Sequence, residues 1–538
     1  MSPILENIFS AAGGLGLLIF GMKIMSSGLE TVAGDRLQSV LQKATSNRFL
    51  AVFVGIIATI VLNSSTSATI ITVGFVNSGL MSLTSALGVI LGSNVGTTFS
   101  SHIIAFRIDA IAPLFILIGV VMYLFFKNRS VKNIGYVILG FGILLMSIRI
   151  MGTPLRAFSQ EPAFQQMLVA FENPFLAVLA SFLFTAVVQS SSATTGVLVT
   201  MHLQGIPIPL ETSAYIILGA NIGTSITTIF ASISASRDSE RAAIFHKLFD
   251  LIGTPIFGTL IYFVPGILGW FENTWSDPAQ QVAMFHTFYN IATLLVLLPF
   301  VNVGAKLMRK IIPVKPDELK KPHGKELLYL TTVGMKSPTL AVANAHLEIC
   351  RMGDIARENL ALALKAFFAR DEHLAQKVRD TEKIINYLNH NISAKLVEIN
   401  DMSLSTSDGE KVGKMLRTVS DIERIGDHAE NIAEYTIALI EERIKFSDIA
   451  TEELAKLSDL TEKVAENALD IYRKQAKSQL EPVKTLEAHI NELAELLPAN
   501  HIDRLKGKLC DPKSGVLFTD MVIDLERIAD HAKNIAFV

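Results

Sequence analysis

The sequence contains the same unusual pattern twice. Residues 49–66 and 175–192 are each an apolar run that ends in one amide residue and three hydroxyl residues, FLAVFVGIIATIVLNSST and FLAVLASFLFTAVVQSSS. Two further pairs repeat at nearly the same spacing: LGSNVGTT at 91–98 with LGANIGTS at 218–225, and residues 14–25 with 140–151. Duplicated apolar segments that hydroxyl and glycine residues interrupt are the best sequence indication of a transporter's central binding site.

The composition divides the chain into two unlike halves. Of the 538 residues 50% are hydrophobic and 18% are charged, but the charges are sparse from about residue 8 to 305 and dense from about 315 onward. The first half therefore predicts a polytopic membrane protein. The net charge of −3 gives no indication of a nucleic-acid partner. Two cysteines, Cys350 and Cys510, provide no disulfide framework and suit a reducing compartment.

We expect an all-α fold with a membrane domain over residues 1–310. It comprises two repeats at about 8–126 and 133–265 and an extra helix at 283–301. The apolar runs within 49–80 and 175–205 are shorter than the roughly 20 residues that a spanning helix needs. They therefore predict re-entrant hairpins or broken helices, which are tolerated where they are buried in protein or line a wet cavity.

Lysine and arginine predict the orientation in the membrane. Basic residues cluster at 34–48, 127–132, 237–247 and 306–310, which assigns these segments to the cytoplasm, whereas the loops at 153–174 and 266–282 fit the outside. The N-terminus is then outside, the C-terminal half is cytoplasmic, and the two repeats are inverted relative to each other.

The two amide-and-hydroxyl motifs are the predicted substrate and ion site. Their side chains accept and donate hydrogen bonds, and the helix that restarts after each motif points free N–H groups at the same place. Neither motif contains Lys or Arg, so an oxyanion would need a co-bound Na⁺, which at ~4 Å and an effective dielectric of 20 contributes about 4 kcal/mol. The alternative is close helix packing by small residues. The predicted contact residues are Asn63, Ser64, Ser65, Thr66, Gln189, Ser190, Ser191 and Ser192.

The glycine-rich pair supplies further candidates. Gly92, Gly96, Gly219 and Gly223 are expected to break their helices and expose carbonyl groups. Asn94 and Asn221 offer oxygens to a cation, and Thr97 and Thr224 are added as contact residues. A buried, hydrogen-bonded asparagine at a helix crossing is the equally weighted alternative.

The segments FHKLFD at 245–250 and FHTFYN at 285–290 form another pair. His246 with Asp250, and His286 with Asn290, are four residues apart and share a helix face. Ionisable residues in a membrane segment are functional candidates by default, so Asp250 and Asn290 are proposed for ion coupling. Pairing of Asp250 with Lys247 or Arg241 is the structural alternative.

The polar half follows a proline-rich linker at 311–338 and is expected to form a helical domain over 339–538 with two tandem three-helix units. DIERIGDHAENIA at 421–433 repeats as DLERIADHAKNIA at 524–536. Each copy places two carboxylates on one helix face, and nearby His and Asp residues suit a divalent or ferric metal. The alternative is a solvated face on which Arg424 and Arg527 neutralise the acids. The metal candidates are Glu423, Asp427, Glu526 and Asp530.

These motifs resemble two known families. QSSSATT at 189–195, NSSTSAT at 63–69, the two Gly-Asn-Gly segments and the FHxLFD and FHxFYN elements resemble the bacterial sodium–phosphate cotransporters, which are related to the type II cotransporters of animals. The resemblance implies Na⁺-coupled movement of inorganic phosphate in the bacterial inner membrane. The chain departs from the family pattern where Asn63 replaces Gln, Thr66 replaces Ser and Asp250 replaces Asn. Residues from about 330 onward resemble the PhoU domain, which implies metal clusters and a regulatory role.

The leading hypothesis is a secondary transporter that moves Na⁺ and phosphate by alternating access. A phosphate sensor without net transport, and a Na⁺-coupled carrier of another oxyanion or a carboxylate, are the alternatives. We find no Walker motif, HExxH or nucleophile elbow, so we expect neither an enzyme nor an ATP-driven pump. Membrane lipid and either a homodimer mate or a cytoplasmic regulatory partner are the other expected partners. The direction of transport and the stoichiometry stay open.

Overall fold

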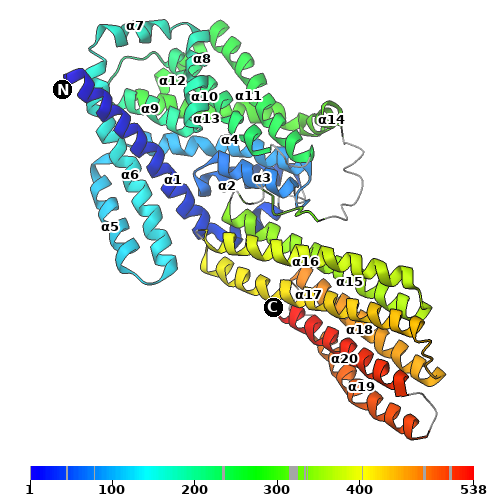
Figure 1. Cartoon of the computed structure of the whole chain (residues 1–538). Helices are drawn as coiled ribbons and strands as arrows, with labels where there is room; N and C mark the ends of the chain where they lie inside the picture. Colours follow the sequence, from blue (N-terminus) through cyan, green and yellow to red (C-terminus); the bar gives the residue numbers. More distant parts are fainter. Residues whose placement is uncertain are drawn as a thin grey trace. The chain divides into compact units, whose positions relative to one another are not determined.

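The computed structural model of the chain describes residues 2–43, 47–77, 79–232, 237–313, 325–331, 335, 337–402, 404–475, 480–507 and 512–538. Every regular element within these ranges is a helix, which confirms the all-α prediction (Figure 1). The chain forms two compact units. One comprises Met1–Leu319 with Lys336–Leu340 and Ser403–Asp408, and the other comprises the remaining residues. Most of the predicted linker at 311–338 lies outside the described residues, as does Cys510, whereas Cys350 is a buried free thiol.

The first unit, here called the membrane unit, contains two similar sets of helices. The first copy comprises α1 (Pro3–Lys43), α2 (Arg48–Leu62), α3 (Ser65–Asn77), α4 (Leu83–Ala105) and α5 (Ala112–Phe125). The second copy comprises α6 (Arg129–Phe158), α7 (Pro162–Ala170), α8 (Pro174–Val188), α9 (Ser191–Leu203) and α10 (Leu210–Ser232). The pairs α2 and α8, α3 and α9, and α4 and α10 begin and end at equivalent positions of the sequence duplication. Four more helices follow: α11 (Arg237–Phe263), α12 (Gly266–Thr274), α13 (Pro278–Leu297) and α14 (Val301–Ile311).

Membrane-spanning character is evident from length and composition. Among the described residues four helical stretches are long and apolar enough to cross a bilayer: Pro3–Ala33, Ser130–Phe158, Arg237–Phe263 and Pro278–Ile311. Two further stretches qualify only as bent pairs, α4 with α5 at 76° and α7 with α8 at 108°. Large apolar side chains on these helices face outward, for example Phe125 at 77% and Val187 at 83% exposure. Such surfaces are suited to lipid.

The broken segments are present as expected, since α2 and α8 have 15 residues each and are followed directly by the 13-residue helices α3 and α9. The short helices α7 and α12 were not predicted and lie within the segments read as outer loops, because nine residues are too few for a clear apolar period. Helix α1 also extends to Lys43, into the segment read as a loop at 34–48.

The expectation that the Gly-Asn-Gly segments break their helices is wrong, because α4 and α10 run uninterrupted through them. The glycines instead allow close approach of two helix backbones. A Cβ atom on Gly96 would lie 2.7 Å from the carbonyl oxygen of Ile56 in α2, and one on Gly223 would lie 2.8 Å from that of Phe182 in α8. This is the packing use of small residues in membrane helices.

The second unit, here called the helical unit, contains two successive groups of three helices. The first group is α15 (Pro338–Ala369), α16 (Glu372–Asn400) and α17 (Thr406–Glu441), and the second is α18 (Asp448–Lys474), α19 (Glu481–Lys506) and α20 (Pro512–Phe537). Each helix buries an apolar stripe, such as Ile385, Leu388, Ile392 and Leu396 in α16.

The close glycine contacts make a stability prediction. A Cβ atom at Gly219 of α10 would meet the backbone oxygen of Val178 in α8, and backbone cannot move aside cheaply. Gly219→Ala should therefore lower the free energy of unfolding by about 1–3 kcal/mol. At Gly16 of α1 no atom lies within 4 Å of the new Cβ, so Gly16→Ala should be neutral or should stabilise by up to about 1 kcal/mol. Thermal unfolding in detergent compares the two, and equal midpoints would contradict the close-packing role.

Candidate functional site

Each amide residue of the duplicated motif forms a break between two helices. Asn63 ends α2 with φ 48° and ψ 32°, and Gln189 ends α8 with φ 60° and ψ 27°. Both are left-handed, which costs an L-residue roughly 1–2 kcal/mol, although asparagine tolerates it better than glutamine does. The backbone N–H of Asn63 donates to Ile60 and that of Gln189 to Thr185. The same strained turn therefore occurs at the same place in both copies.

The first serine after each break caps the next helix. The Ser64 hydroxyl oxygen accepts from the backbone N–H of Ser67 at 3.1 Å, and the Ser190 oxygen accepts from that of Ala193 at 3.1 Å. Such caps contribute about 1 kcal/mol each. They leave the serine O–H available as a donor beside a helix N-terminus, where N–H groups and the helix dipole favour an anion.

The remaining motif hydroxyls lie in the first turns of α3 and α9. Ser65, Ser191 and Ser192 are buried, with exposures of 6%, 4% and 8%, whereas Thr66 is half-buried. The two amides differ. Asn63 is buried and accepts a 2.7 Å hydrogen bond from the Ser100 hydroxyl, and Gln189 is exposed. The shorter Asn63 amide therefore lies against α4, whereas the longer Gln189 amide is exposed.

The second motif also contacts the first copy. The Ser101 hydroxyl in α4 donates to the Thr195 hydroxyl in α9 at 3.4 Å. Thr195 in turn donates to the backbone carbonyl of Ser191 at 2.9 Å. A hydrogen-bonded path therefore joins α4 of the first copy to the buried serine of the second motif.

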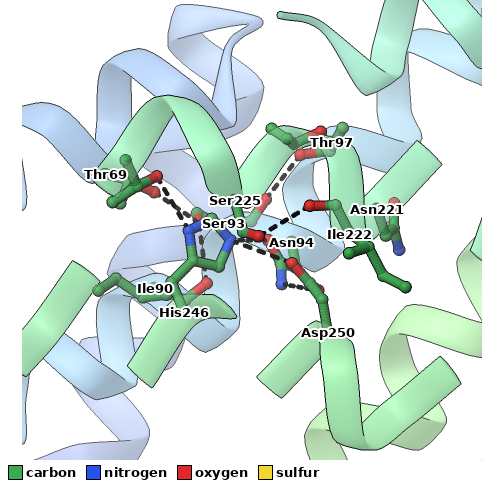
Figure 2. Close-up of polar contacts among 12 residues, drawn as sticks. Thr69, Ile90, Ser93, Asn94, Thr97, Asn221, Ile222, Ser225, His246 and Asp250 are labelled. Atoms are coloured by element: carbon green, nitrogen blue, oxygen red, sulfur yellow. Dashed lines mark hydrogen bonds and ion pairs between the residues drawn. The ribbon is translucent and has the colours of Figure 1, made fainter. Parts of the chain in front are cut away.

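Asn94 of α4, Thr228 of α10, and His246 and Asp250 of α11 form a polar group, here called the Asp250 group. Figure 2 shows Asn94, His246 and Asp250 of this group. The Asn94 amide nitrogen donates to Asp250 Oδ1 at 3.3 Å, and its Oδ1 lies 3.1 Å from His246 Nε2. The other ring nitrogen of His246 lies 3.1 Å from the Thr228 hydroxyl. Asp250 and His246 are each 1% exposed. The four side chains therefore form one buried chain of hydrogen bonds.

A matching group contains Ser101, Asn221, His286 and Asn290, here called the Asn290 group. The Asn221 amide nitrogen donates to Asn290 Oδ1 at 3.3 Å, and the Ser101 hydroxyl lies 3.0 Å from His286 Nδ1. Asn290 and His286 are 1% and 0% exposed. Asn94 and Asn221 occupy equivalent positions of the duplication, and so do Thr228 and Ser101. The structure thus brings together both FH segments and both Gly-Asn-Gly helices.

Two predicted contact residues are used differently. The hydroxyls of Thr97 and Thr224 donate to carbonyls of their own helices, at Ser93 and Ala220. Four of the residues in these contacts were not predicted as site residues: Ser100, Ser101, Thr195 and Thr228. Ser101 and Thr228 could have been found, because both follow the Gly-Asn-Gly pattern by the same number of residues. Asp250 forms no ion pair with Lys247 or Arg241 among the described residues, since Arg241 pairs with Asp238.

The surface hollow beside Asn63 has a volume of about 340 Å³. Apart from Asn63 its lining is apolar and includes Ile60, Phe99 and Phe141. Such a lining suits hydrocarbon and not a phosphate ion. The polar groups described above, and not this hollow, are therefore the candidate site.

The helical unit pairs its repeated segments across each other. His428 of α17 lies 2.6 Å from Asp524 of α20, and His531 of α20 lies 2.9 Å from Asp421 of α17. Tyr435 adds a 2.6 Å hydrogen bond to Asp524, and burial together with this bond raises the pKa of the tyrosine. The repeated His and Asp residues thus join the two three-helix groups.

The predicted metal ligands do not fit a metal site. Arg424 lies 3.9 Å from Glu423 and 3.4 Å from Asp427, and Arg527 lies 3.8 Å from both Glu526 and Asp530. Within the described ranges there is no group of three or more His, Cys, Asp or Glu side chains placed to hold a metal ion. The prediction of a divalent or ferric metal is therefore unsupported, and the solvated-face alternative describes these residues better.

Two carboxylates that the sequence analysis missed lie beneath this surface. Glu382 of α16 is 1% exposed and its two oxygens accept no hydrogen bond within the described structure. Burial, together with Asp427, Glu430 and Glu423, raises the pKa of Glu382 to about 8. The equivalent Glu487 of α19 is 6% exposed but accepts hydrogen bonds from Lys533 at 2.8 Å and Asn491 at 3.0 Å.

The duplicated broken helices, the buried polar groups and the apolar outer surface together define a multi-pass membrane protein of the transporter class. Residues 17–153 and 144–258 each match the Na⁺/Pi-cotransporter family, and residues 349–436 and 454–538 each match the PhoU domain. Residues 17–258 therefore form a domain of the Na⁺/Pi-cotransporter family, and residues 349–538 form a PhoU-like domain. Neither match is to an enzyme family.

Two named proteins and one solved structure are similar to parts of this chain. A protein of Salmonella typhimurium, named as a candidate inorganic phosphate export protein, YjbB, is 27% identical over 82% of this chain and 80% of its own length. The uncharacterized protein YqeW of Bacillus subtilis is 29% identical over 55% of this chain and 95% of its own length. The crystal structure of PhoU from Pseudomonas aeruginosa is 25% identical over 36% of this chain and 93% of that chain, with a TM-score of 0.34.

The helical unit yields a pH prediction. The pKa of Glu382 is about 8 in the folded chain against an ordinary value of 4.5, so between these pH values only the folded state holds the proton. Stability should therefore fall as the pH rises through this window and level off above it. Glu382→Gln should remove this slope and stabilise α16 at pH 8.5, as measured by hydrogen exchange of the full chain in detergent.

Glu487→Gln is the matched control. Because Glu487 is paired with Lys533, its neutralisation should destabilise α19 by about 1–3 kcal/mol at the same pH. If both variants changed stability in the same direction, the assignment of Glu382 as an unpaired buried acid would be wrong.

Proposed function

We propose that the membrane unit couples Na⁺ to the movement of inorganic phosphate by alternating access. Family membership supports phosphate transport. The observation that carries the proposal is the matched pair of left-handed breaks at Asn63 and Gln189, each followed by a serine-capped helix N-terminus. Two such termini supply N–H groups and O–H donors, which are what an oxyanion requires.

The charge balance favours ion coupling. The motif segments 63–66 and 189–192 contain no Lys or Arg, so the phosphate would enter a low-dielectric site without a fixed positive partner. A Na⁺ ion at ~4 Å would contribute about 4 kcal/mol at an effective dielectric of 20. Hydroxyl and amide oxygens of the same motifs are ligands that suit a hard cation. Each tenfold Na⁺ gradient then supplies about 1.4 kcal/mol per ion.

The proposed contact residues are those of the two motifs together with Asn94 and Asn221. Ser64 and Ser190 donate to the anion from the helix N-termini, and Ser65, Ser191 and Ser192 provide further oxygens in the first turns. Thr97 and Thr224 support the proposal least, because their hydroxyls donate to carbonyls of their own helices.

The proposed location is the bacterial inner membrane, with the N-terminus outside and the helical unit in the cytoplasm. The support is the distribution of Lys and Arg, which also makes the two copies inverted repeats. The PhoU-like unit is proposed to regulate transport. The relatives named for phosphate export favour outward movement, although a symporter runs in either direction according to its gradients.

Purified protein in proteoliposomes tests the proposal. An imposed Na⁺ gradient should accelerate uptake of radioactive phosphate over an equal choline gradient, and arsenate, sulfate and citrate should be compared as competitors. Phosphate flux that ignores the Na⁺ gradient would contradict the coupling.

Substitution of the motif should strongly lower flux at subsaturating phosphate without loss of folding. Ser190→Ala and Gln189→Ala each remove a donor beside the helix N-terminus, and the loss of one hydrogen bond to a charged ligand, about 1.5–3 kcal/mol, corresponds to a roughly 10- to 100-fold lower affinity. Ser147→Ala is the control, because this buried serine donates only to the carbonyl of Leu144 in its own helix. Normal phosphate transport by both motif variants would place the binding site elsewhere.

A further inference from the structure

The Asp250 group and the Asn290 group are built from equivalent residues but differ in one charge. Asn94 and Asn221 correspond, and His246 and His286 correspond, yet a carboxylate in the first group is replaced by the Asn290 amide in the second. Both groups are buried, with Asp250 and Asn290 each 1% exposed. The chain therefore contains a charged and a neutral group built from the same residue types, although His286 Nε2, unlike His246 Nε2, has no hydrogen-bond partner among the described residues.

Among the described residues Asp250 has no full positive partner. Its Oδ1 accepts from Asn94, while Oδ2 is buried and has no hydrogen-bond donor within the same part of the chain. The basic side chain paired with it there is His246, with Nε2 at 3.7 Å from Oδ2, beyond hydrogen-bonding distance.

The hydrogen bonds of His246 are satisfied by a neutral ring. Asn94 donates its amide to Asp250, so Asn94 Oδ1 is the acceptor facing His246 and the proton lies on Nε2. Nδ1 can then accept from the Thr228 hydroxyl. The group as a whole carries one negative charge, and an isolated buried carboxylate costs several kcal/mol unless a cation joins it.

The Asn290 group needs no such cation. The amide oxygen of Asn290 accepts from Asn221, and its amide nitrogen donates to the carbonyl of His286 at 2.9 Å. All side chains of this group are neutral when His286 is neutral. The second group is therefore electrically complete where the first lacks one positive charge.

We propose that the Asp250 group binds one monovalent cation, Na⁺ or a proton, for which the Asn290 group has no equivalent site. The cation would contact the free Oδ2 of Asp250. This inference rests on the proposed transport function, and it makes the number of positive charges that accompany each phosphate depend on this one side chain.

If the cation at Asp250 is a proton, titratable groups on the helices packed against α11 influence its binding. Tyr289 of α13 is completely buried and interacts electrostatically with Asp250. The other titratable or charged residues on the described parts of these helices are His102 on α4, Glu211 and Tyr215 on α10, His286 on α13, and Lys306, Arg309 and Lys310 on α14. The described helix α3 contains no such residue.

The test counts charges. In proteoliposomes the reversal potential of phosphate flux and the flux ratio of radioactive Na⁺ to phosphate are measured for the natural chain, for Asp250→Asn and for Asp250→Asn with Asn290→Asp. Asp250→Asn should reduce the charge moved per phosphate by one, and the double variant should restore it by moving the carboxylate to the other group.

The flux ratios identify the cation. A lower ratio of Na⁺ to phosphate in Asp250→Asn identifies Na⁺, whereas an unchanged ratio with less proton co-transport identifies the proton, and either result supports the site. Unchanged charge per phosphate in an active Asp250→Asn variant would overturn it.

A binding measurement keeps the inference separate from transport. The unfolding midpoint of the full chain in detergent is titrated with NaCl against choline chloride, and with pH in the absence of Na⁺. Asp250→Asn should raise the half-saturating cation concentration at least tenfold, or remove the stabilisation by cation, even if no variant transports phosphate. Equal cation stabilisation of the natural chain and Asp250→Asn would reject the site, whereas absent Na⁺-driven flux alone would reject only the proposed transport function.

Discussion

Backbone polar groups exposed by a helix break inside an apolar bundle have to be satisfied by hydrogen bonds, and this constraint governs the membrane unit. At Asn63 and Gln189 the left-handed turn allows one more backbone bond to the helix before it, and the following serine caps the helix after it. The first solution uses the backbone, and the second uses the short polar side chain of Ser64 or Ser190. The chemistry that completes the backbone is therefore the same chemistry that places donors beside a helix N-terminus.

The close approach of the surrounding helices follows from this arrangement. A 15-residue helix such as α2 or α8 has little surface with which to bury itself, so α4 and α10 approach it at glycine positions. Gly96 lies against Ile56 and Gly223 against Phe182, and side chains larger than hydrogen would separate the helices. The asparagines between the glycines then lie within reach of α11 and α13, where they join the two polar groups.

The repeated sequence was sufficient to predict the broken helices, because two independent copies placed Asn63 and Gln189 at the same position of their runs. It also paired the segments that contain Asp250 and Asn290. It could not predict that α4 and α10 stay intact, since glycine serves both helix ends and close packing and local sequence does not distinguish these uses. Ser101 was missed because its partner His286 is 185 residues away in the sequence, and Thr228 was missed because its contact with His246 depends on how α10 packs against the next helix, α11.

In the helical unit the sequence indicated the repeated carboxylates but not which of them are buried. Glu382 and Glu487 occupy equivalent positions on the second helix of each three-helix group. Their surroundings differ because Glu382 lies near the acidic Glu430, whereas Glu487 is paired with the basic Lys533. A periodic pattern shows that an acid lies on a helix face, whereas its partner depends on the packing of three helices. Arginines one turn away also changed the interpretation of Glu423 and Asp427 from metal ligands to a neutralised surface.

Helices α4 and α10 each contribute to both polar groups, since α4 supplies Asn94 to one and Ser101 to the other, while α10 supplies Asn221 and Thr228 in the reverse order. A displacement of either helix along its axis therefore alters both groups at once. The two copies of the duplication are mechanically interlocked, and the energetic effects of substitutions in separate groups will not simply add.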